Sequence, residues 1–165
     1  MTIREICLFG ILAALTFAAK YVMSWLPNIE PVSLMVMLFA VVFGIKALFP
    51  IYVYVLMEIL FYGLGTWNFN YFYIWAVLAF VAMAMRGMKG SLGWAVLSGC
   101  FGLLFGALCA PVDIFIGGFG YAISKWITGI PFDLLHCAGN FTIALLLFNP
   151  MRKLIETLYQ KTIHS

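Results

Sequence analysis

Charged side chains are scarce in this sequence. Only 9% of its 165 residues are Asp, Glu, Lys or Arg, whereas 65% are hydrophobic and 18% are aromatic. A soluble globular domain has about a quarter of its residues charged. The composition therefore excludes an ordinary soluble domain and predicts a protein that is embedded in the lipid bilayer.

Three other absences narrow the function. The four cysteines lie in apolar segments and show no CxxC pair or zinc-type spacing, so neither a disulfide nor a metal site is predicted. The sequence has no Walker A motif and no glycine-rich phosphate loop, so any energy from ATP must come from another protein. The net charge of +3 is too small to indicate nucleic acid, and no cofactor is predicted.

The apolar segments predict an all-α membrane protein with six transmembrane helices in a single substrate-binding domain over residues 1–165. A chain of this length supplies about six spans of some 20 residues with short connections. The expected spans are about 6–26, 32–43 (or to 48), 50–64, a fourth that follows the aromatic connection 63–75 and ends near 85, 91–110 and 131–148.

The connections set the expected topology. Pro27–Pro31 is predicted to be an outer loop, 44–46 and 86–90 are inner turns, and the glycine-rich stretch 111–128 is expected to be an outer lid or a re-entrant piece. Residues 151–165 are predicted to form a cytoplasmic amphipathic helix. Seven of the nine basic residues fall on one side of this arrangement, so the positive-inside rule places both termini in the cytoplasm.

The stretch from Gly129 to Asn140 carries polar groups inside an apolar segment. Asp133, His136 and Asn140 are spaced i, i+3 and i+7, so they project from one helix face. Polar side chains without partners cost several kcal/mol, roughly, in hydrocarbon. This face is therefore predicted to look onto protein or a cavity, and it is the first site hypothesis.

Further polar and aromatic groups fall in the same outer half of the predicted topology. Asn140 is expected about 10 Å deeper in the membrane than Asp133. Glu58 is expected either to contact a ligand or to be satisfied structurally by a tyrosine, Tyr54 or Tyr62. The outer half offers an outward-opening pocket whose aromatic walls suit a flat heterocyclic molecule. Its other candidate residues are Glu58, Asn70, Trp67, Trp75 and Glu30.

The charges of this half favour a neutral or cationic ring over an anion, because Glu30, Glu58 and Asp133 outnumber Lys20 and Lys125. Two stripes of small residues predict close helix contacts. Gly10, Ala14 and Ala18 pack either inside the protein or against an external helix, whereas Gly102, Gly106 and Ala110 predict a tight internal contact.

The whole chain resembles the substrate-binding S-component of energy-coupling factor (ECF) type ABC importers. The resemblance lies in the six spans, the cytoplasmic termini, the motif Ala14-x-x-x-Ala18 and the motif Gly-Ile-Pro-Phe-Asp133-x-x-His136. It implies a high-affinity capture subunit for a vitamin or vitamin precursor in a prokaryotic plasma membrane. Asp133, His136 and Asn140 would contact the ligand. The family frequently has lysine where His136 stands, which puts a ligand carboxylate or phosphate at this position in question.

The resemblance also implies partners. Ala14 and Ala18 would dock on a transmembrane coupling subunit that acts with two ATPase subunits. Three other functions stay open: an intramembrane enzyme using Asp133, His136 and Glu58, a stand-alone small secondary transporter, and a purely structural subunit. No enzyme activity is predicted, because no nucleophile or second histidine is near Asp133 and His136. No inverted repeat favours a lone transporter.

Overall fold

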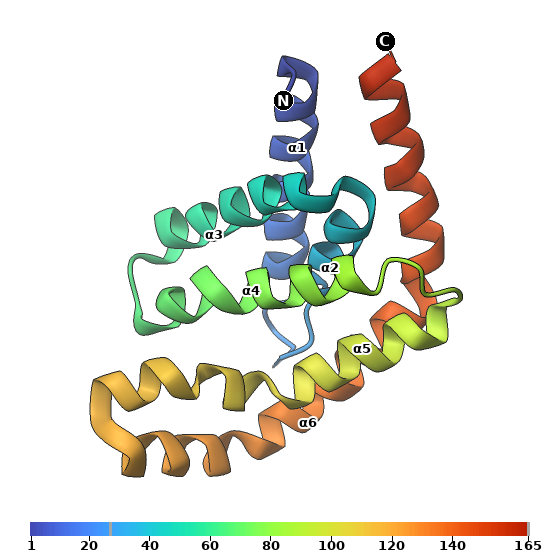
Figure 1. Ribbon diagram of the computed structural model, residues 1–165. Coiled ribbons are helices and arrows are strands. Elements are labelled where there is room, and N and C mark those ends of the chain that lie inside the picture. Colours follow the sequence, from blue (N-terminus) through green and yellow to red (C-terminus); the bar gives the residue numbers. More distant parts are fainter. Residues whose placement is uncertain (27, 165) are drawn as a thin grey trace.

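The computed structural model describes residues 1–26 and 28–164, and within these ranges it is helical without any strand. The all-α prediction is therefore confirmed. The elements in chain order (Figure 1) are α1 (Ile3–Val22), α2 (Val32–Phe43), the 3-10 turn η1 (Gly44–Ala47), α3 (Leu48–Tyr62), α4 (Thr66–Ala84), α5 (Ser91–Leu103) and α6 (Phe105–His164).

Helix α1 begins and ends earlier than predicted. The Thr2 hydroxyl accepts a hydrogen bond from the Glu5 N–H, and the Glu5 carboxylate accepts one from the Thr2 N–H. This capping box satisfies backbone donors at the first turn and starts the helix at Ile3. After Val22 the backbone tightens into turns, with Leu26 N–H bonded to the Met23 carbonyl at 2.9 Å. Pro27, where the helix was expected to stop, lies outside the described residues.

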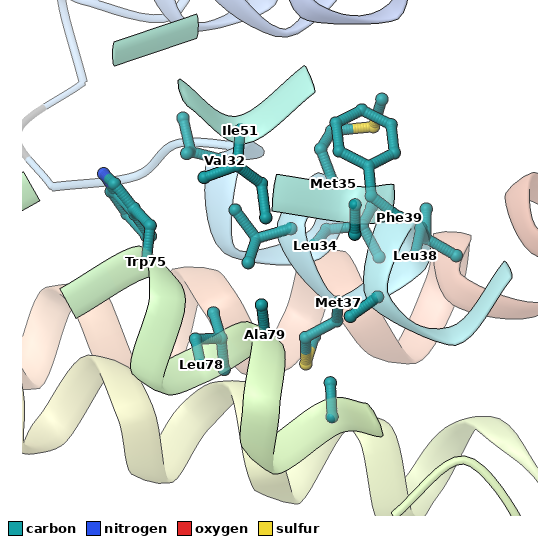
Figure 2. Close-up of a cluster of buried hydrophobic side chains, with 14 of the residues drawn as sticks. Val32, Leu34, Met35, Met37, Leu38, Phe39, Ile51, Trp75, Leu78 and Ala79 are labelled. Atoms are coloured by element: carbon teal, nitrogen blue, oxygen red, sulfur yellow. The ribbon is translucent and has the colours of Figure 1, made fainter. Parts of the chain in front are cut away.

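Helix α2 lies in the centre of the molecule and has the predicted bounds. Nearly all of its side chains are buried, and they pack against α4, α6 and α3. Figure 2 shows Leu34 and Met37 of α2 beside Leu78 and Ala79 of α4. Gly44 ends α2 with a φ of 57°, a left-handed conformation that glycine adopts without strain.

The predicted aromatic connection over 63–75 is largely wrong. Only residues 63–65 connect α3 to α4, because α4 already begins at Thr66. The buried Asn68 side chain accepts a hydrogen bond from the Gly65 N–H at 2.7 Å, which caps the first turn. The aromatic residues that follow are therefore presented at helical spacing.

The C-terminal third differs most from the prediction. The expected helix over 91–110 breaks at Leu104, and the stretch 111–128 is helical. Its expected role as an outer lid or re-entrant piece stays a prediction. Gly118 has φ 79° and ψ 178°, so the helix reverses there. In Figure 1 the yellow stretch leaves α5 and the orange stretch returns beside it.

The last predicted helix, 131–148, is also wrong at both ends. Helix α6 passes through Pro131 and Pro150. A proline inside a helix removes one backbone hydrogen bond, and it can bend the helix without ending it. The red C-terminal stretch in Figure 1 leaves the orange stretch at a steep angle. The expected tail helix is present, with Ile155 buried and Leu154 exposed.

Glycines bring α5 and α6 together, as the second small-residue stripe predicted. A β-carbon built on Gly102 would lie 2.8 Å from the His136 carbonyl group, and one on Gly99 would lie 3.3 Å from the Phe141 β-carbon. Side chains at these positions would push α6 away. Because Gly99 and Gly102 have no side chains, α6 packs closely against α5, and this contact places His136 inside the bundle.

Four helical stretches are long and apolar enough to cross a membrane: Ile3–Val22, Val32–Tyr62, Thr66–Ala84 and Ser91–Ile163. This agrees with a helical membrane protein, but six separate spans are not confirmed. The two ends of the chain lie at the same end of the molecule (Figure 1), where the Tyr159 hydroxyl donates to Glu5 at 2.9 Å. Their cytoplasmic location stays a prediction.

Candidate functional site

A pocket of about 310 Å³ lies between the end of α1, the loop that follows it, α4, and the start and middle of α6. We call it the His136 pocket. Its lining combines a charged pair, two aromatic rings and an imidazole with loop residues. Its polar and aromatic lining residues include Lys20, Asn28, Glu30, Tyr71, Phe105 and His136.

His136 is the most informative side chain of this pocket. It is only 3% exposed, and its ring meets the Phe105 ring edge to face at 4.9 Å between centroids. Within the described ranges, neither ring nitrogen has a hydrogen-bond partner. A neutral imidazole offers one donor and one acceptor, and leaving both unused in a buried place is costly. A ligand in the pocket could satisfy both.

The charged groups of the His136 pocket form a cluster around Lys20. Its ammonium group lies 2.7 Å from Glu58 and 3.8 Å from Glu30, and it donates to the Tyr71 hydroxyl at 3.3 Å. Lys20, rather than the expected tyrosine, is the partner of Glu58. The Glu58 side chain is 2% exposed, and among described residues its second oxygen has no partner. Burial raises the pKa of the Glu30 carboxyl, although Lys20 opposes this shift.

A second pocket, of about 260 Å³, adjoins Asp133, and we call it the Asp133 pocket. Asp133 is 5% exposed, and its two oxygens share the Gly106 N–H at 3.1 and 3.3 Å. Lys125 forms an ion pair with the buried Asp113 at 2.6 Å. Two indole rings, an amide and a thiol complete the polar and aromatic wall: Trp67, Trp126, Asn70 and Cys109.

The structure thus divides the predicted substrate-binding residues between two pockets and the buried interior. Glu30 and His136 line the His136 pocket, and Glu58 lies behind Lys20. The Asp133 pocket contains Asp133, Asn70 and Trp67. Trp75 is fully buried in the aromatic core, and it meets the rings of two residues of the His136 pocket, Tyr71 at 5.4 Å and Phe105 at 6.0 Å between centroids.

Asn140 shares the predicted helix face but has partners inside the protein. Its amide nitrogen donates to the Ser33 hydroxyl at 3.0 Å and to the Ser98 carbonyl at 3.3 Å. These bonds tie α6 to α2 and α5. The structure does not bring Asn140 to either pocket, and its contacts hold buried segments of three helices together.

Sequence reasoning missed several lining residues. Tyr71 and Phe105 carry no signal beyond being aromatic in an aromatic-rich chain. Asp113 and Lys125 were detectable as isolated charges in an apolar stretch. They are 12 residues apart, however, and their pairing depends on the reversal at Gly118, which the sequence did not predict.

The proposed docking residues lie on an unpartnered face of α1. Ala14 and Ala18 are exposed, as are the neighbouring Ile11 and Leu15. A β-carbon on Gly10 would meet no described atom within 4 Å. The described residues therefore do not show the internal packing that was one of the two interpretations of this stripe.

The acid and base groups of the alternative enzyme hypothesis do not form one cluster. In the described part of the chain, no hydrogen bond or ion pair joins Asp133, His136 and Glu58 to one another. No group of three or more His, Cys, Asp or Glu side chains there could hold a metal ion. Comparisons of the chain with protein-family models, curated proteins and solved structures found no match.

Proposed function

We propose that this chain is the substrate-capture subunit of an ECF-type ABC importer. One observation carries the proposal: His136 is almost completely buried in the wall of a pocket, yet both of its ring nitrogens lack a partner among the described residues. Such a group is expected where a ligand completes the hydrogen bonds. The chain binds and releases this ligand without changing it chemically.

The proposed ligand is a small heterocyclic molecule of the vitamin or vitamin-precursor kind. A volume of about 310 Å³ lies at the lower end of the usual range for small-molecule pockets. Tyr71 and Phe105 offer aromatic faces for a flat ring, and His136 offers directional hydrogen bonds. Lys20 is engaged by two carboxylates, which disfavours an anionic ligand.

The proposed topology retains six spans with both termini in the cytoplasm of a prokaryotic cell. The His136 pocket then opens outward, because the loop after α1 that closes it lies opposite the chain termini in that topology. The contact between Glu5, Lys46 and Tyr159 supports placing the N-terminus, the η1 turn and the tail on the same side of the membrane. Arg86 and Lys89 would lie on the same cytoplasmic side.

The proposed partners are a transmembrane coupling subunit and two ATPase subunits. The chain contains no ATP-binding motif of its own, and the small, exposed Ala14 and Ala18 leave room for a partner helix to approach α1. Docking and ligand binding use different surfaces, so a substitution on α1 should separate them.

This separation gives the test. Affinity purification of the tagged chain from its native membranes should yield one transmembrane protein and two ATPases. The Ala14→Leu/Ala18→Leu variant should lose these partners, because the added side chains block close approach, while its retention of a bound small molecule is unchanged. Ala138→Leu, at an exposed alanine of α6, is the control. Capture of no ATPase by the unmodified chain, or equal loss of partners and ligand in the variant, would contradict the proposal.

A further inference from the structure

We infer that the substrate is a small organic cation whose positively charged nitrogen binds in the Asp133 pocket. The inference rests on the proposed function, because it assigns the charge of the molecule that the His136 pocket captures. The residues that carry the inference all line the Asp133 pocket: Asp133, Trp67, Trp126 and the ion pair Asp113–Lys125.

The two pockets have neighbouring residues of α6 in their walls. Asp133 and His136 are three residues apart on its same face, and both are buried. The adjacent residues Phe105 and Gly106 form the opposite side, Phe105 toward the imidazole and Gly106 toward the carboxylate. In the proposed complex the ring of the molecule meets His136 and its charged substituent lies on the side of Asp133.

The charges in the Asp133 pocket are not balanced by the chain itself. Lys125 is already matched by Asp113 at 2.6 Å. Asp133 makes no ion pair with any described residue, and its only hydrogen-bond donor there is the Gly106 N–H, which its two oxygens share. A carboxylate has room for several donors. A buried carboxylate with so few is stabilised strongly by a cation.

An independent observation in the His136 pocket points the same way. Lys20 faces two carboxylates, Glu30 and Glu58, and the second oxygen of Glu58 is buried without a partner among the described residues. Lys20 and Lys125 are therefore both paired with carboxylates, and the carboxylates near Lys20 outnumber it two to one. This arrangement receives a cation and disfavours an anion.

The aromatic rings suit a cation as well. Trp67 and Trp126 both line the Asp133 pocket, and an indole face attracts an ammonium or amidinium group. Gly106 brings these elements together, because a β-carbon there would lie 2.5 Å from an Asp133 oxygen and 3.1 Å from the Trp126 ring. Only glycine lets the carboxylate and the indole meet beside the same backbone N–H.

The inference can be tested with three probes that share a ring and differ in charge: benzylamine, benzyl alcohol and benzoate. Binding to the purified full-length protein is followed by tryptophan fluorescence and by thermal unfolding. We expect benzylamine to bind at least tenfold more tightly than benzyl alcohol, and benzoate to bind most weakly. No benzylamine binding, or equal binding of the three probes, would overturn the inference.

Two variants give effects of opposite sign. Asp133→Asn should weaken benzylamine at least tenfold and leave benzyl alcohol unchanged, because only the carboxylate charge is removed. Lys125→Met frees Asp113 and should strengthen benzylamine several-fold, which keeps the inference testable if the Asp133 variant does not fold. Glu156→Gln, on the tail helix, is the control. Benzylamine binding that is unchanged in both variants would refute the assignment.

The inference and the proposed function can fail separately. A protein that prefers benzylamine as expected but never copurifies with ATPases would contradict the function and leave the cation site intact. A protein that captures the ATPases but binds the three probes without regard to charge would contradict only the cation site.

Discussion

Replacing Lys20 with methionine would leave the Glu58 carboxylate buried without its cation. The Lys20 ammonium group lies 2.7 Å from Glu58, whose side chain is 2% exposed. Methionine retains most of the aliphatic length of lysine and its packing against the neighbouring rings, so the substitution removes chiefly the charge. The Lys20→Met variant therefore removes the cation from the close pair with Glu58 and from the longer contact with Glu30.

The magnitude follows from the burial of the two partners. Removing one member of a fully buried ion pair costs about 3–5 kcal/mol. The Lys20 side chain is 19% exposed, so solvent screens part of the interaction, and we expect a loss of about 2–3 kcal/mol. For a chain of this size the loss corresponds to a decrease in Tm on the order of 5 to 10 °C.

Thermal unfolding of the purified protein in one detergent measures this loss, and a second substitution tests its cause. In Lys20→Met/Glu58→Gln both charges of the close pair are gone, so most of the lost stability should return, apart from the smaller contribution of the Lys20–Glu30 contact. The reasoning is refuted if Lys20→Met is as stable as the unmodified protein, or if the double variant is no more stable than Lys20→Met.

Two further substitutions test the packing of the bundle. Gly102→Ala should destabilise the protein by about 1–3 kcal/mol, because the new β-carbon would lie 2.8 Å from the His136 carbonyl group. Gly10→Ala, in a helix but facing open space among the described atoms, is its control in thermal unfolding and should not destabilise; equal effects would contradict the close contact. Glu5→Gln should accelerate hydrogen exchange in the C-terminal tail, because the carboxylate accepts hydrogen bonds from both the tail and the η1 turn. Glu156→Gln, in an exposed pair within one helix, should have little effect, and unchanged exchange in Glu5→Gln would show that this contact does not hold the tail.

The sequence predicted the features that depend on local pattern. Helical spacing correctly placed Asp133, His136 and Asn140 on one buried face. The glycine stripe around Gly102 correctly indicated a close contact between helices. The bounds of α2 were also correct, because a continuous apolar run ends at a glycine with positive φ.

The features that depend on contacts distant in the sequence were not predictable. The reversal at Gly118 brings Asp113 to Lys125, yet nothing distinguishes this glycine from its neighbours in the sequence. Lys20 reaches Glu58 across 38 residues. The face shared by Asp133 and His136 suggested one pocket, but the two residues line different pockets, whose other walls come from segments distant in the sequence.

Native mass spectrometry of the protein purified without added ligand tests the capture function most directly. We expect one bound non-lipid small molecule per chain, with a heterocyclic ring and a positively charged nitrogen. The His136→Leu variant should lose this molecule, because the replacement fills the same space without hydrogen-bonding atoms. Absence of any such molecule from the unmodified protein, or its full retention in His136→Leu, would contradict the account.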